Sequence, residues 1–87
     1  MTLEEIYKVF LAHPEVTTDS RRCPAGSMFF ALKGESFDGN RFAAKALETG
    51  ADVAVVDDPG VVPEGALRQT PDGEGRYILV EDVLRTL

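Results

Sequence analysis

A hydroxyl and a guanidinium follow one another in the segment Asp19-Ser20-Arg21-Arg22. A serine hydroxyl can donate a hydrogen bond to a phosphate oxygen, and the planar fork of an arginine matches phosphate geometry. The pattern therefore favours contact of Ser20 and Arg21 with an anionic group such as a diphosphate. A second interpretation stays open, in which Asp19 closes a local turn through its carboxylate and the arginines extend into water.

A second candidate segment runs from Lys33-Gly34 to Asp38-Gly39-Asn40 and contains two glycines. Glycine lets a ligand approach the backbone closely, and the first turn of a helix presents free N–H groups to an anion. Asn40 is a suitable N-cap for a helix over residues 41–49. The segment fits one wall of an anion site, and it also fits an ordinary loop between a strand and a helix.

Catalytic and metal chemistry has few candidate residues in this sequence. His13 is the only histidine and Cys23 the only cysteine, which argues against a Ser-His-Asp triad, a disulfide or a thiolate zinc site. The phosphate loop of ATP-hydrolysing proteins needs Gly-Lys-Ser/Thr, whereas Lys33 here precedes Gly34. We therefore expect no catalytic residue, metal or cofactor within this chain.

The charge distribution narrows the class of partner. Fifteen acidic and nine basic residues give a net charge of −6, the opposite sign to that of a nucleic-acid binder. Residues 19–45 nevertheless hold five basic and three acidic side chains, which suits one small anionic ligand. No apolar run approaches the ~20 residues of a membrane helix, and the acidic N-terminus is unlike a signal peptide. We expect a cytoplasmic protein with neither nucleic acid nor membrane as partner.

Apolar periodicity predicts the elements that position these residues. A capping box at Thr2 and Glu5 precedes a helix that ends near residue 12. The predicted strands are residues 16–18, 28–32, 53–56 and 77–80, with a brief strand at 66–68 paired to the last across the turn at 71–73. Strand, helix and strand over residues 28–56 form a βαβ unit. The fold class is therefore α/β, with a small mixed β-sheet flanked by helices.

The aromatic residues and the C-terminal pattern complete this prediction. Phe29, Phe30 and Phe42 are expected in the core, although one of them could border a base. A chain of 87 residues holds one domain, which we assign to residues 1–80. Residues 81–87 begin a helical pattern that stops after barely two turns, so we expect them to lead into a further domain.

Several ordered blocks resemble the N-terminal domain of the Mur ligases of the MurE and MurF types. The blocks are residues 18–21, 26–34, 37–42, 46–51 and 54–56. They cover residues 16–57 closely, and the segment from Phe29 to Glu35 is more similar to the MurF type. The resemblance implies the fold of that domain.

The resemblance also implies a role for the chain. In this family the first domain binds the UDP part of UDP-N-acetylmuramoyl-peptide, and the central domain binds ATP and Mg²⁺. The third domain, with the second, receives the amine, which is D-Ala-D-Ala in the MurF type. An acyl phosphate forms on the peptide carboxylate and the amine attacks it. The parent would be an ATP-dependent amide ligase of peptidoglycan synthesis, in which this chain docks substrate beside the central and C-terminal domains and does not catalyse.

The resemblance assigns residues to the UDP moiety. Ser20 matches the diphosphate contact with Arg21 beside it, while Lys33-Gly34 and Asp38-Gly39-Asn40 match the walls of the uridine site. The family often has His where Asn40 stands, and an amide could still read a uracil edge because it both donates and accepts. We expect the two segments to converge on one positively charged notch. The MurE type, and a non-catalytic interaction domain on the same scaffold, remain alternatives.

Overall fold

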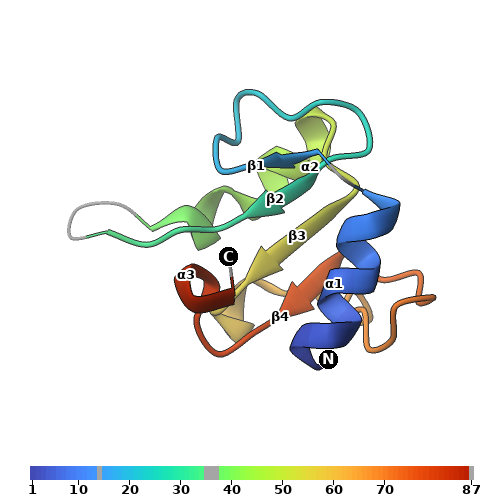
Figure 1. Cartoon of the computed structure of the whole chain (residues 1–87). Coiled ribbons are helices and arrows are strands. Elements are labelled where there is room, and N and C mark those ends of the chain that lie inside the picture. The colour runs from blue at the N-terminus through green and yellow to red at the C-terminus, as the bar shows by residue number, and fades with distance from the viewer. Residues whose placement is uncertain (14, 35–37, 87) are drawn as a thin grey trace.

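A four-stranded parallel sheet forms the centre of the computed structural model, which describes residues 1–13, 15–34 and 38–86 (Figure 1). The strands are β1 (Val16–Thr17), β2 (Met28–Phe30), β3 (Val53–Val56) and β4 (Tyr77–Leu79), in the order β1-β2-β3-β4. Met28 lies opposite both Val16 and Val53, and Val55 lies opposite Ile78. The α/β class and the βαβ unit are confirmed.

The sheet is parallel between all of its named strands, whereas the sequence predicted a mixed sheet. The segment predicted as a strand at 66–68 contributes one bridge, in which Leu67 pairs with Tyr77 in parallel. The Tyr77 N–H donates to the Ala66 carbonyl at 3.1 Å, and the Arg68 N–H donates to the Tyr77 carbonyl at 2.7 Å. The residues between 68 and 77 therefore form a loop that returns the chain in the same direction, and not a hairpin turn.

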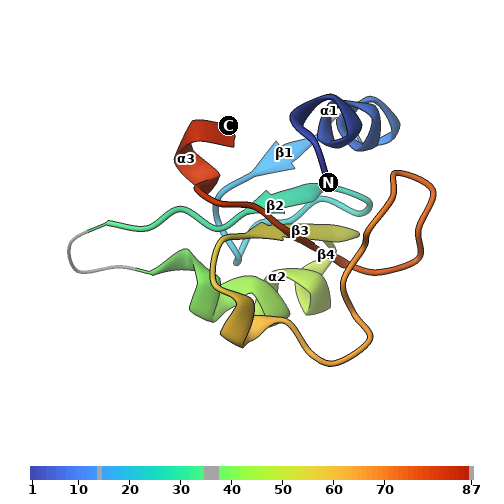
Figure 2. The ribbon, with the colours of Figure 1, turned by 90° about the horizontal axis from the view of Figure 1, so that it is seen from below.

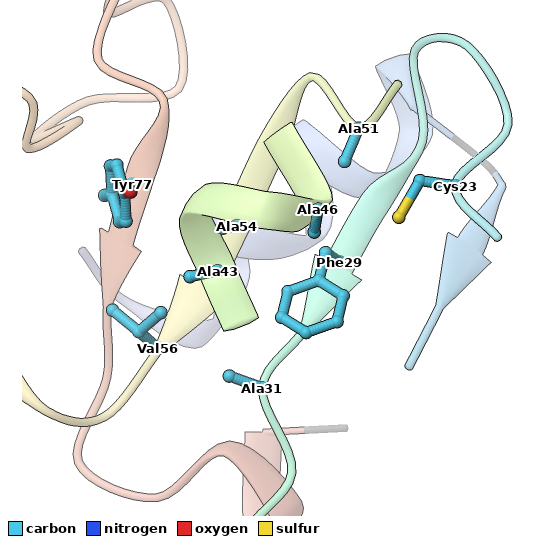
Figure 3. Close-up of a cluster of buried hydrophobic side chains, with 9 residues drawn as sticks. All are labelled: Cys23, Phe29, Ala31, Ala43, Ala46, Ala51, Ala54, Val56 and Tyr77. Atoms are coloured by element: carbon cyan, nitrogen blue, oxygen red, sulfur yellow. The ribbon is translucent and has the colours of Figure 1, made fainter. Parts of the chain in front are cut away.

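Helices cover both faces of the sheet (Figure 2). The helices α1 (Leu3–Ala12) and α3 (Val83–Thr86) lie on one face, and α2 (Ala43–Thr49) lies on the other. Strand side chains point to alternate faces, so each strand supplies both sides of the core. The core under α1 and α3 consists of Ile6, Val9, Met28, Phe30, Val53, Val55, Ile78 and Val83. Figure 3 shows the other core, where Phe29 lies beneath α2 with Ala43 and Ala46.

The capping box predicted at the start of α1 is confirmed. The Thr2 N–H donates to Glu5 Oε1 at 2.9 Å, and the Glu5 N–H donates to Thr2 Oγ1 at 3.2 Å. At the other end of α1, His13 Nδ1 lies 3.0 Å from the Val9 carbonyl oxygen and Nε2 lies 2.6 Å from Asp52 Oδ2. The helix is thus fixed at both ends, and its C-terminal end is tied to the residue before β3.

The helix predicted over residues 41–49 has a different beginning. Residues Gly39–Phe42 form a 3₁₀ helix, η1, and α2 follows directly. The cap is Asp38 and not Asn40, because the Asp38 carboxylate accepts from the Asn40 N–H at 3.1 Å. Gly50 ends α2 as predicted, with its N–H donating to the Ala46 carbonyl. No helix in the described ranges has the length and apolar character needed to cross a membrane.

Candidate functional site

A cavity of about 610 Å³ lies between the loop after β1 and the start of α2. Its lining consists of Thr18, Asp19, Ser20, Arg21, Phe29, Phe42 and Lys45, and we call it the 18–21 cavity. The loop follows the carboxyl end of a parallel strand, which is where open α/β sheets bind their ligands. The cavity therefore occupies a place that suits a binding site.

Side chains of the loop itself hold the 18–21 segment in shape. The Thr17 hydroxyl donates to the Arg22 carbonyl at 2.9 Å and accepts from the Asp19 N–H at 3.1 Å. The Asp19 carboxylate accepts from the Arg21 N–H at 2.9 Å, so the local turn foreseen at Asp19 is present. The Ser20 hydroxyl forms no hydrogen bond within the described ranges, and it stays available to a ligand at the cavity.

The charge of Arg21 is partly compensated by its neighbour. Its guanidinium Nε lies 3.1 Å from Asp19 Oδ1, and Nη2 lies 3.3 Å from Asp19 Oδ2. The hydrogen bond from Arg21 holds the pKa of the Asp19 carboxyl below its usual value, and the same contact raises the pKa of Arg21. The Arg21 side chain is 84% exposed, so this pair is in contact with water. An anion in the cavity would have to share the guanidinium with Asp19.

Lys45 and Phe42 are cavity residues that the sequence analysis did not assign to the site. Lys45 is exposed and has no ion pair within 4.0 Å in the part of the chain that the structure describes. Phe42 was expected in the core but is 40% exposed, whereas Phe29 and Phe30 are buried as expected. A cation three residues after an aromatic residue lies on the same side of a helix, which is the signal that could have revealed both.

The second predicted segment does not line the 18–21 cavity. Lys33 lies at another cavity, of about 380 Å³, with Asp57, Glu81, Asp82 and Leu84. Gly34 is exposed beside it. Residues 35–37 of the family-like pattern lie outside the described residues. Among the described residues, Lys33 and the 18–21 segment therefore do not line one common cavity, and Lys33 lies instead with acidic residues that follow β3 and β4.

Asn40 joins η1 to the end of β3 through all of its side-chain amide atoms. Its Nδ2 donates to Asp38 Oδ1 and to Asp57 Oδ1, both at 2.8 Å. Its Oδ1 accepts from the N–H groups of Asp57 at 3.0 Å and of Asp58 at 3.3 Å. The residue is 2% exposed. We call this arrangement the Asn40 latch, and it engages both polar atoms of the side-chain amide.

The two residues before Asn40 also serve the local backbone. The pKa of the Asp38 carboxyl lies below its usual value because it accepts hydrogen bonds from the Asn40 side chain and backbone. The Gly39 N–H donates to the Leu32 carbonyl at 2.7 Å, and a Cβ on Gly39 would lie 2.5 Å from that oxygen. Gly39 thus permits a close approach between two backbone segments. Of the seven predicted contact residues, Ser20 and Arg21 line the 18–21 cavity, and contact of any of the seven with a ligand stays a prediction.

The family described as "Mur ligase family, catalytic domain" matches residues 14–84, which is most of the chain. The chain belongs to the Mur ligase family. This finding agrees with the resemblance drawn from residues 16–57 and extends it to β4 and the start of α3.

Curated relatives that match this chain are named as ligases of UDP-N-acetylmuramoyl peptides. UDP-N-acetylmuramoyl-L-alanyl-D-glutamate--2,6-diaminopimelate ligase of Parasynechococcus marenigrum is 39% identical over 88% of this chain, and that of Solibacter usitatus is 44% identical over 79%. UDP-N-acetylmuramoyl-tripeptide--D-alanyl-D-alanine ligase of Synechocystis is 48% identical over 51% of this chain. The chain spans only 15%, 14% and 10% of these three proteins. The MurF likeness of residues 29–35 is thus not confirmed, because both ligase types match.

Solved structures confirm the fold. MurF ligase from Thermotoga maritima in complex with ADP has a TM-score of 0.59 and 29% identity, covering 83% of this chain and 14% of that chain. A MurF structure from Acinetobacter baumannii has a TM-score of 0.60 over 92% of this chain and 18% of its own, at 24% identity. The parallel sheet with helices on both faces is therefore the arrangement found in Mur ligase structures.

Proposed function

We propose that this chain is the N-terminal domain of an ATP-dependent amide ligase and that it holds the UDP part of UDP-N-acetylmuramoyl-peptide in the 18–21 cavity. The observation that supports this most is that the Ser20 hydroxyl and the Lys45 ammonium line one cavity, and that neither has a hydrogen bond or ion pair among the residues the structure describes. Family membership makes a nucleotide precursor the first ligand to test.

Ser20 and Lys45 fit the diphosphate of a uridine diphosphate. The Ser20 hydroxyl would donate to a diphosphate oxygen. Lys45 would supply positive charge to the diphosphate, because the charge of Arg21 is already partly compensated by Asp19. Phe42, which also lines the cavity, would form part of the wall beside the nucleotide. The Asn40 latch would not contact the base, since its amide is already bonded to Asp38, Asp57 and Asp58.

Docking of UDP would assist the reaction by positioning the substrate, although the UDP group itself does not react. Binding energy from a part of the substrate that does not react can position the reacting carboxylate in a neighbouring domain. We place ATP and Mg²⁺ in the rest of a longer parent, together with the amine site, because the Gly-Lys-Ser/Thr loop is absent from this sequence. In this proposal residues 1–80 form the docking domain, residues 81–87 lead into the central domain, and the parent works in the cytoplasm.

The amine that the parent adds has two candidates. Residues 29–35 favour D-Ala-D-Ala, the amine named for the Synechocystis relative. Diaminopimelate is favoured by the greater share of this chain that the Parasynechococcus relative matches. The two ligases named for these relatives use UDP-N-acetylmuramoyl peptides, so the proposed docking role is the same for both.

Titration calorimetry with UDP and with UDP-N-acetylmuramoyl-tripeptide tests the proposal. We expect Ser20→Ala and Lys45→Ala each to weaken UDP binding roughly tenfold, because each removes one interaction with the charged diphosphate. Lys8→Ala is the matched control, since Lys8 is an exposed helical lysine on α1, on the other face of the sheet. Equal affinity for the wild-type chain, Ser20→Ala and Lys45→Ala would refute the assignment of the cavity.

A further inference from the structure

An apolar groove lies on the face of the sheet opposite the 18–21 cavity, between α1 and the end of α3. It consists of two cavities of about 740 and 460 Å³ that share Leu3, Ile6 and Thr86. Glu4 is the only charged residue among those described that line the larger cavity, and the rest of its wall consists of Tyr7, Phe10, Val16 and Phe30. We call this surface the α1–α3 groove.

The groove leaves large apolar side chains in water. Leu3 is 66% exposed and Tyr7 is 58% exposed, although both belong to the helix that covers the core. A contiguous patch of this kind on a small domain usually marks an interaction surface. The 18–21 cavity requires none of these residues, so nucleotide docking does not account for them.

The course of the chain identifies the segment that would cover the groove. Thr86, the last residue described, lines both cavities. Figure 2 shows α1 and α3 on the same side of the sheet, with the C-terminal end turned toward α1. A continuation of α3 beyond Thr86 would therefore start at the edge of the groove.

The helix α3 has the pattern of a longer amphipathic helix. Val83 packs in the core under α1 and α3, and its N–H donates to Asp57 Oδ2 at 3.1 Å, which caps the helix. Side chains three and four positions apart share one face of a helix, and in the sequence a leucine stands four positions after Val83. A continuation of α3 would lay this apolar face along the groove.

We propose that the α1–α3 groove binds the chain's own continuation, an amphipathic helix that extends α3 beyond position 87 and joins the docking domain to the next domain. The inference rests on the proposed function, because it requires a longer parent. The Parasynechococcus relative is long enough to contain such a helix and a further domain, because the match covers 88% of this chain but 15% of that protein. The bound helix would hold the two domains in a fixed relation, which the docking of a remote UDP group requires.

The test compares the 87-residue chain with a chimera that carries the ~25 residues following the matched segment in the Parasynechococcus relative. Leu3→Ala probes the groove, and Leu11→Ala is the matched control, because Leu11 is 59% exposed on the same helix and outside the groove. We expect the extension to raise the midpoint of thermal unfolding by several degrees. We expect Leu3→Ala to remove most of that gain and Leu11→Ala to leave it unchanged.

Three results would overturn the inference. The first is an extension that does not raise the midpoint of thermal unfolding, and the second is an equal effect of Leu3→Ala and Leu11→Ala on that midpoint. The third is a dimer of the 87-residue chain in sedimentation equilibrium that Leu3→Ala dissociates. The last result would mean that the groove binds a second copy of this chain. UDP titration of the same proteins separates the two proposals. Loss of helix docking with UDP binding intact contradicts only this inference, and docking without UDP binding contradicts only the nucleotide site.

Discussion

Replacing Asn40 with aspartate should destabilise the fold by about 3 kcal/mol at pH 7. The Asn40 Nδ2 donates to Asp38 and Asp57 at 2.8 Å each, so Asn40→Asp would set a carboxylate oxygen against two others in a buried site. Asn40→Ala should lower the free energy of unfolding by less, about 2 kcal/mol, because it leaves the hydrogen-bonding groups of Asp38, Asp57 and Asp58 without a partner but adds no charge. Urea unfolding of both variants measures these differences.

The loss of folding stability caused by Asn40→Asp should depend on pH. Neighbouring carboxylates raise the pKa of an introduced acid in the folded state, so the folded protein takes up a proton more readily than the unfolded chain as the pH falls. The difference in free energy of unfolding between Asn40→Asp and wild type should therefore become smaller as the pH falls from 7 to 5. Gln69→Glu, the same change at an exposed position, is the control and should alter stability little at either pH. Wild-type stability in Asn40→Asp at pH 7 would contradict the Asn40 latch.

Gly39→Ala should destabilise the fold by about 3 kcal/mol. A Cβ at this position would lie 2.5 Å from the Leu32 carbonyl oxygen and 2.8 Å from the Leu32 nitrogen, and backbone atoms cannot move aside as a side chain can. Gly60→Ala is the matched control, because the nearest atom to its Cβ is an Asp58 side-chain oxygen at 3.1 Å.

Thermal and urea unfolding of both glycine variants measures the difference. If Gly39 served mainly to admit a ligand, Gly39→Ala would keep wild-type stability and lose UDP binding. That pair of results would contradict the structural role that we assign to Gly39.

The elements that the sequence predicted well depend on local signals. Thr2 and Glu5 satisfy each other within one turn of helix, and residues 53–56 form an apolar run that can only be a buried strand. Strand direction at residues 66–68 was missed, because Pro71-Asp72-Gly73 has the composition of a hairpin turn. The parallel bridge of Leu67 to Tyr77 depends on the path that the chain takes through β3 and the following 3₁₀ helix, η2 (Pro59–Val61).

The candidate site was only partly predictable for a similar reason. An amide such as Asn40 suits a base edge and a buried latch equally well, and the groups that decide between them, Asp57 and Asp58, lie 17 and 18 residues away. Helical periodicity assigned Phe42 to the core, whereas residues 39–42 form a 3₁₀ helix with three residues per turn, which rotates Phe42 outward. The spacing of Phe42 and Lys45 indicated a shared helix side, but only the structure showed that Lys45 and Ser20 line the same cavity.

Backbone amide shifts of the ¹⁵N-labelled chain during a titration with UDP test the central claim most directly. We predict that the residues whose signals move will be 18–21, Phe42 and Lys45, around the 18–21 cavity. The signals of Tyr7 in the α1–α3 groove and of Lys33 at the acidic cavity should stay in place. Shifts centred on either of those two surfaces, or no shifts at millimolar UDP, would contradict a nucleotide site between the loop after β1 and α2.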